Sequence, residues 1–92
     1  MKITLELPDY DGRATDVIWE EDASVRLDAG HGEVVLSANR AGLTALAKQM
    51  LYLADESLPA GSHVHYDDLL LDEGSNRALI IEKRSFPTGK PE

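Results

Sequence analysis

A chain of 92 residues with a mass of 10.1 kDa accommodates one compact domain, which excludes multidomain enzymes. Seventeen acidic residues against nine basic ones give a net charge of −8, which repels nucleic acid and anionic membrane surfaces. The charge therefore favours a basic protein as the partner. The chain has no cysteine, so it offers neither a disulfide framework nor thiolate metal ligands.

Hydrophobic patterning indicates a protein that neither crosses a membrane nor enters the secretory route. No apolar run approaches the roughly 20 residues of a membrane-spanning helix. Alternation begins at Lys2, and no apolar stretch of signal-peptide length follows it. We therefore expect a cytoplasmic protein with a single domain over residues 1–85 and a flexible tail over residues 86–92.

Two strand patterns occupy the first 20 residues. Apolar and polar residues alternate over residues 2–7, which predicts a strand with one buried face that ends at Pro8. Residues 17–20 form a short segment rich in β-forming types, and they predict a second strand.

A hairpin pattern comes next. Val25 and Leu27 alternate with polar residues, and the same alternation returns at Val34 and Leu36. The intervening Ala29-Gly30-His31-Gly32 contains two glycines that can supply the positive φ of a tight reversal.

The period changes to that of a helix over residues 39–56. The apolar residues that recur at helical spacing are Leu43, Leu46, Ala47, Met50, Leu51 and Ala54. We expect this side to face the core and Arg40, Lys48, Gln49 and Asp55 to face water. Ser37 or Asn39 can cap the helix, and Leu58-Pro59-Ala60-Gly61 cannot continue it.

Two more strands follow the helix. Val64 and Tyr66 alternate with polar residues over 63–67, and residues 77–84 contain a run that is apolar on both faces, which predicts a central strand. Together the patterns predict an α+β fold, in which a largely antiparallel sheet of about five to six strands packs on one amphipathic helix. The other face of the sheet is expected to be open to solvent.

The segment around His63 carries the most distinctive chemistry. On a strand, His63 and His65 lie on one face about 7 Å apart at Cα, and two imidazoles at that spacing can share a metal with Asp67 as a third ligand. A zinc site needs three or four protein ligands, so solvated histidines beside acidic neighbours are the interpretation we favour. We expect no cofactor.

Patterns for enzymatic chemistry do not support catalysis. The serines do not occur in a nucleophile-elbow pattern, and there is no cysteine to pair with a histidine. Gly30 and Gly32 bracket a hairpin instead of opening a helix after a strand, as a phosphate loop would. We predict a non-enzymatic protein.

Acidic residues are concentrated near the start of the chain. Residues 6–22 hold seven acids and one base, a local charge of −6. Such a surface either steers and selects a basic protein, the interpretation we favour, or serves solubility alone. Trp19 within it is either an interface anchor or a core residue. The candidate partner-binding residues are Trp19, Glu20, Glu21, Asp22, His63, His65, Asp67 and Asp68.

From residue 39 onward the chain resembles a known family. The matching segments are Asn39-Arg40-Ala41-Gly42-Leu43, Leu46-Ala47, Leu51, Leu53-Ala54, Leu58 to Asp67, Glu73-Gly74-Ser75 and Leu79 to Lys83. They are similar to the immunity protein 32 family, small bacterial α+β proteins that are encoded beside polymorphic toxins and neutralise them. The resemblance implies an intracellular protein that binds a cognate toxin domain tightly and has no catalytic activity.

Three functional hypotheses follow from the sequence. The first is an inhibitor that binds a basic toxin and occludes its active surface. The second is a small metal-binding protein that uses His63, His65 and Asp67. The third is an oligomeric accessory domain, because an uncovered sheet face or edge can pair with a second copy to form a homodimer.

Overall fold

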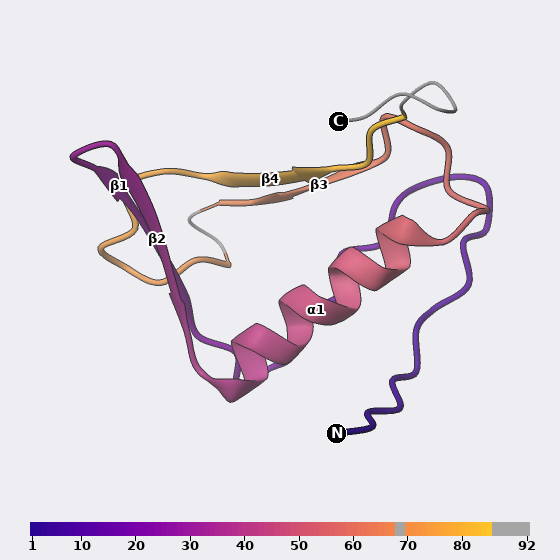
Figure 1. Cartoon of the computed structure of the whole chain (residues 1–92), viewed down its shortest axis with the longest axis horizontal. Helices are drawn as coiled ribbons and strands as arrows, with labels where there is room; N and C mark the ends of the chain where they lie inside the picture. The colour runs from indigo at the N-terminus through magenta and orange to yellow at the C-terminus, as the bar shows by residue number, and fades with distance from the viewer. Residues whose placement is uncertain (68–69, 86–92) are drawn as a thin grey trace.

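The computed structural model describes residues 1–67 and 70–85, and the predicted tail over residues 86–92 lies outside them. The described residues form an α+β fold with four strands in two antiparallel two-stranded sheets and one helix. In chain order the elements are β1 (Val25–Gly30), β2 (Glu33–Ala38), α1 (Arg40–Ala54), β3 (His63–Tyr66) and β4 (Leu79–Glu82). Figure 1 shows the β1–β2 hairpin at one end of α1 and the β3–β4 pair lying alongside the helix.

The predicted hairpin is confirmed. β1 and β2 pair in register from Val25 opposite Ala38 to Gly30 opposite Glu33. The two turn residues, His31 at φ 53° and Gly32 at φ 76°, both have positive φ, as a reversal of this hand requires. The expectation for Gly30 was wrong, because the left-handed position falls on His31.

The predicted helix is confirmed, but of the apolar residues predicted to face the core only Leu46 is buried. Asn39 caps the helix by accepting a hydrogen bond from the Gly42 N–H at 2.8 Å. The residues that α1 buries are Gly42, Ala45, Leu46, Gln49, Tyr52 and Leu53. Gly42 explains this choice, because a Cβ at that position would lie 2.6 Å from the Ser24 carbonyl oxygen and 2.8 Å from the Val25 side chain. The helix therefore approaches the start of β1 closely at Gly42.

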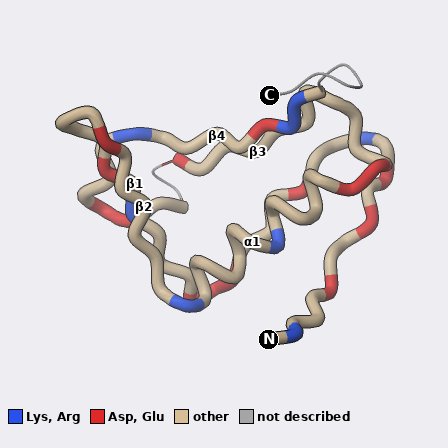
Figure 2. The backbone as a smooth tube through the Cα atoms, in the orientation of Figure 1, with Lys and Arg blue, Asp and Glu red and all other residues tan. Residues whose placement is uncertain are grey.

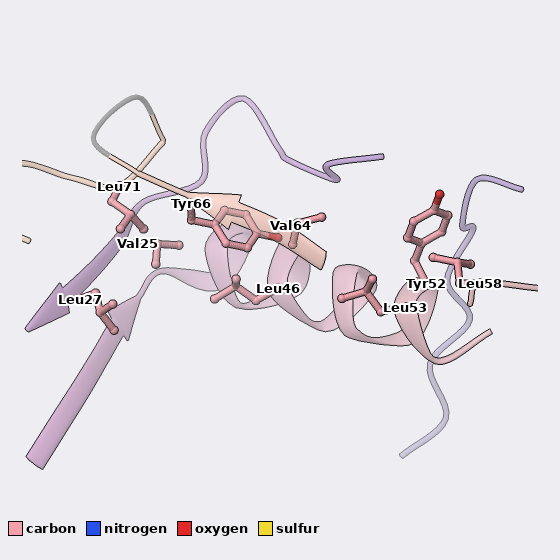
Figure 3. Packing of buried hydrophobic residues seen from close by; sticks show 9 residues of the cluster. All are labelled: Val25, Leu27, Leu46, Tyr52, Leu53, Leu58, Val64, Tyr66 and Leu71. Atoms are coloured by element: carbon pink, nitrogen blue, oxygen red, sulfur yellow. The ribbon is translucent and has the colours of Figure 1, made fainter. Parts of the chain in front are cut away.

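The core lies between α1, β1 and β3. Figure 3 shows Leu46 and Leu53 of the helix pointing toward Val64 and Tyr66 of β3. The whole buried cluster consists of Val25, Leu27, Leu46, Tyr52, Leu53, Leu58, Val64, Tyr66 and Leu71. Alternation in β3 is as predicted, with Val64 and Tyr66 buried and the two histidines exposed.

The prediction of one sheet of five to six strands was wrong, because an irregular segment over residues 72–76 separates two small sheets. The N–H groups of Asp72 and Asn76 donate to the carbonyls of Val25 and Leu27 on β1. In return, the Ser75 hydroxyl accepts from the Leu27 N–H, and the Asn76 side chain accepts from the Ala29 N–H. Because these contacts satisfy the backbone groups along that edge of β1, the β3–β4 pair does not join it.

Two predicted strands are absent, and a third is misplaced. Residues 2–7 form no strand, and Ile3 and Leu7 are exposed, because alternation alone supplies no neighbouring strand to pair with. Residues 17–20 also form no strand. The segment predicted as a central strand forms β4, which pairs with β3 and leaves Ile80 exposed.

Candidate protein-binding surfaces

The exposed face of the β3–β4 pair carries both histidines. His63 lies opposite Glu82 and His65 opposite Ile80, and all four side chains are exposed. The imidazole rings meet edge to face with their centroids 5.0 Å apart. His63 Nδ1 lies 2.9 Å from the Gly61 carbonyl oxygen, to which it donates in the matching tautomer. The face predicted to be open is therefore a mixed surface of imidazole, carboxylate and aliphatic groups.

The predicted metal ligands do not assemble into a site. Asp67 follows Tyr66, the last residue of β3, and is exposed, and Asp68 lies outside the described residues. Within residues 1–67 and 70–85, no group of three or more His, Cys, Asp or Glu side chains is placed to hold a metal ion. The two histidines alone fall short of the ligand number of a zinc site.

Trp19 and the acids that follow it are divided between core and surface. The Trp19 ring packs on the core with its centroid 5.6 Å from that of Tyr66. Glu20 is half-buried and forms an ion pair with Lys48 of α1 at 2.9 Å, whereas Glu21 and Asp22 are exposed. Of these four predicted partner-binding residues, Glu21 and Asp22 are the most accessible to another protein.

Sequence patterning missed the polar centre of the core, Gln49. Its side chain is fully buried, with 0% exposure, although the helical pattern predicts a water-facing position. Its Oε1 accepts from the Ile18 N–H at 2.7 Å and from the Tyr66 hydroxyl at 2.9 Å, and its Nε2 donates to the Asp16 carbonyl at 3.0 Å. Gln49 thus supplies residues 16–18 with the hydrogen bonds that a neighbouring strand would otherwise make, and it positions the acidic segment on α1.

The side of α1 that faces away from the core carries an uncovered apolar strip. We call it the α1 stripe: Leu43, Ala47, Met50, Leu51 and Ala54. All five residues are exposed, and the three large ones retain 53%, 52% and 52% of their accessible surface. At 1.5 Å per residue the stripe runs about 16 Å along the helix. Three large apolar side chains gathered on one face of a helix are typical of an interaction site.

Shallow depressions flank the two sides of the α1 stripe. One of about 220 Å³ lies between the helix and β4 and is lined by Met50, Leu53, Ala54, Ile81, Glu82 and Lys83. The other, of about 270 Å³, lies beside the first turns of the helix and is lined by Glu20, Asp22, Arg40, Ala41 and Thr44. A carboxylate and a basic group therefore lie on each side of the apolar strip.

Acidic residues are spread over much of the described chain. Figure 2 shows Asp and Glu at intervals along the N-terminal segment and on the loop that follows α1. Beyond the end of the helix, hydrogen bonds from the Ser57 side chain and N–H lower the pKa of the Asp55 carboxyl below its ordinary value. This group is therefore negatively charged at neutral pH.

A comparison with known proteins assigns the chain to a family. A family model described as immunity protein 32 matches residues 33–84, which is more than half of the chain. The chain belongs to the immunity protein 32 family. The match runs from β2 through β4 and includes the whole α1 stripe, while residues 16–22 precede it. Neither a curated protein nor a solved structure matches the chain.

Family membership confirms two predictions made from the sequence. The resemblance over the second part of the chain was correct, and so was the prediction of a non-enzymatic protein. Membership also implies a cognate toxin as the partner. In the part of the chain that the structure describes, no helix is long and apolar enough to cross a membrane.

Proposed function

We propose that this protein neutralises a cognate bacterial toxin by binding the toxin domain and occluding its active surface. The observation that carries the proposal is the family match over residues 33–84. The net charge of −8 supports a basic partner, because opposite net charges accelerate encounter and favour correct partners over acidic ones. Inhibition of this kind requires contact alone and no chemistry from the immunity protein.

The fold supports a rigid binder. Gln49, the N-cap Asn39 and the loop over residues 72–76 tie the irregular segments to the helix and to β1 through hydrogen bonds. A surface that is ordered before binding loses little conformational entropy when the complex forms.

The direct test is a calorimetric titration of the purified protein against the purified toxin domain encoded by the neighbouring gene. We expect a one-to-one complex at low salt and loss of the toxin's activity at the same stoichiometry. Absence of a complex at low salt would overturn the proposal, and so would a complex that leaves the toxin fully active. In the negative control, bovine serum albumin, an unrelated acidic protein, replaces this protein in the titration against the toxin domain.

A further inference from the structure

We propose that the α1 stripe is the docking surface for the toxin, and that it accepts an apolar ridge flanked by charges complementary to Asp22, Arg40 and Glu82. This inference rests on the proposed function and adds to it the surface that binds and the chemistry of the surface that is bound. The stripe is a continuous strip of aliphatic side chains on a regular helix, at relative spacings of four, seven, eight and eleven residues. Such spacing presents one apolar face for insertion between the side chains of a partner.

Burial elsewhere on the helix shows that the stripe is surplus to the core. The hydrophobic core is closed by Leu46, Tyr52 and Leu53 on the other side of α1. Met50 and Leu51 are about half exposed, whereas the residues before and after them in the sequence, Gln49 and Tyr52, are buried. Apolar groups that the fold leaves in water gain free energy when a partner covers them.

The charges beside the stripe define the chemistry of the partner. Glu82 lies on the β4 side and Asp22 on the side of the N-terminal segment. Lys83 donates its Nζ hydrogens to the carbonyls of Asp55 and Leu58, and Lys48 is paired with Glu20. Arg40 lines the same depression as Asp22, so charges of both signs lie beside the stripe. A partner complements this arrangement if basic groups beside its apolar ridge reach Glu82 and Asp22 and an acidic group reaches Arg40.

The net charge of the chain disfavours a second copy as the occupant. Two copies meeting at their α1 stripes would bring two chains of net charge −8 together. Like charges juxtaposed at an interface oppose association. A basic toxin surface experiences attraction in the same position.

The test compares variants that remove apolar surface without adding charge. Met50→Gln combined with Leu51→Gln keeps side-chain length and helix propensity close to those of the wild type. Val35→Gln is the matched control, because Val35 is 51% exposed and lies on β2 away from the helix stripe. Each protein is titrated against the toxin domain encoded by the neighbouring gene, after circular dichroism has verified its fold. If the double variant fails to fold, Leu43→Gln at the other end of the stripe replaces it.

We expect the stripe variant to raise Kd at least tenfold, mainly through faster dissociation, and the control to remain within twofold of the wild type. Binding of a folded stripe variant within twofold of the wild type would overturn the inference and leave the proposed function standing. No binding by the wild type would overturn the proposed function itself. Light scattering distinguishes the remaining occupant: a dimeric wild type with a monomeric stripe variant would assign the stripe to self-association and overturn the inference.

Discussion

Gln49 is the residue on which the irregular part of the fold depends most. It is a fully buried polar side chain whose amide group joins the N-terminal segment, the helix and β3. A buried amide is tolerated only when its hydrogen bonds are made, and here both its oxygen and its nitrogen have partners. Removing the amide leaves the buried Tyr66 hydroxyl and the partly buried backbone groups of Asp16 and Ile18 without these partners.

Gln49→Leu is expected to lower the free energy of unfolding by about 3 kcal/mol, because it leaves the Ile18 N–H, the Asp16 carbonyl and the Tyr66 hydroxyl without partners. Tyr66→Phe removes one of these hydrogen bonds while Gln49 keeps the others, so its cost should be about 1 kcal/mol. Urea unfolding followed by circular dichroism measures both. Equal costs for the two substitutions would contradict the role assigned to Gln49.

Burial also makes Tyr66 a source of alkaline sensitivity. Desolvation raises the pKa of Tyr66 to about 12 in the folded protein, against an ordinary value of 10.0. Below pH 10 the hydroxyl is protonated in both states, and this contribution to stability is complete. Between pH 10 and 12 the unfolded chain loses the proton that the folded chain retains, so stability falls as pH rises.

The measurement is the difference in unfolding free energy between wild type and Tyr66→Phe at several values of pH. Because Phe cannot ionise, we expect the advantage of the wild type to shrink as pH rises from 9 toward 12. Other groups titrate in both proteins and cancel in the difference. Parallel curves over this range would show that Tyr66 ionises equally easily in both states.

At the scale of elements, the contact between α1 and β1 determines which face of the helix is buried. Gly42 lies against the backbone at Ser24 and the side chain of Val25, where a methyl group does not fit. The cap residue Asn39 reinforces the same contact, because its side chain also accepts from the Ser24 N–H and donates to the Asp22 carbonyl. The start of the helix and the entry into β1 are thus one packed unit.

Gly42→Ala should therefore destabilise the protein by about 1–3 kcal/mol, even though alanine favours helices more than glycine does. Gly30→Ala is the matched control, since a Cβ there would have nothing within 4 Å. Thermal unfolding of the two variants compares them directly. A stabilising Gly42→Ala would mean that the helix can move away from β1 without cost.

Contacts between segments that are distant in the sequence, such as that of Gly42 with the start of β1, account for the differences between prediction and structure. The hairpin, the helix and β3 were predictable because each has a strong local pattern: paired alternations around a turn, a helical period with a cap, and alternating burial. The buried face of the helix was not, because residues 40–54 are apolar over most of their circumference and the close contact of Gly42 depends on a distant segment. The division into two sheets was not predictable either, because side chains of Ser75 and Asn76 complete the edge of β1.

Of the candidate surfaces, the histidine face of β3 was predictable from the sequence and the α1 stripe was not. Exposure of His63 and His65 follows from strand alternation, which is a local property. Exposure of the α1 stripe was hidden, because its residues have the pattern of a core face, and a core face and an interface have the same composition. Which of the two they form depends on Gln49 and Gly42, whose burial requires contacts with residues 16–25.

For the whole molecule, charge should control the speed of association. Asp22→Lys places a positive charge beside the α1 stripe, and Glu33→Lys makes the same change in net charge at the tip of the hairpin. If the local field steers the toxin, Asp22→Lys lowers the association rate several-fold more than Glu33→Lys does, and added salt reduces the difference. Stopped-flow mixing with the toxin domain measures both rates. Equal rates for the two variants would assign steering to net charge alone.

Neutralisation of a toxin in living cells tests the central claim most directly. A bacterial strain expresses the toxin domain encoded by the neighbouring gene under one inducer and this protein under another, and growth is followed with and without the second inducer. The account predicts that the wild type restores growth and that the folded Met50→Gln, Leu51→Gln variant, expressed to the same level, restores it less at limiting induction. Arrest of growth despite abundant, folded wild-type protein would contradict the account.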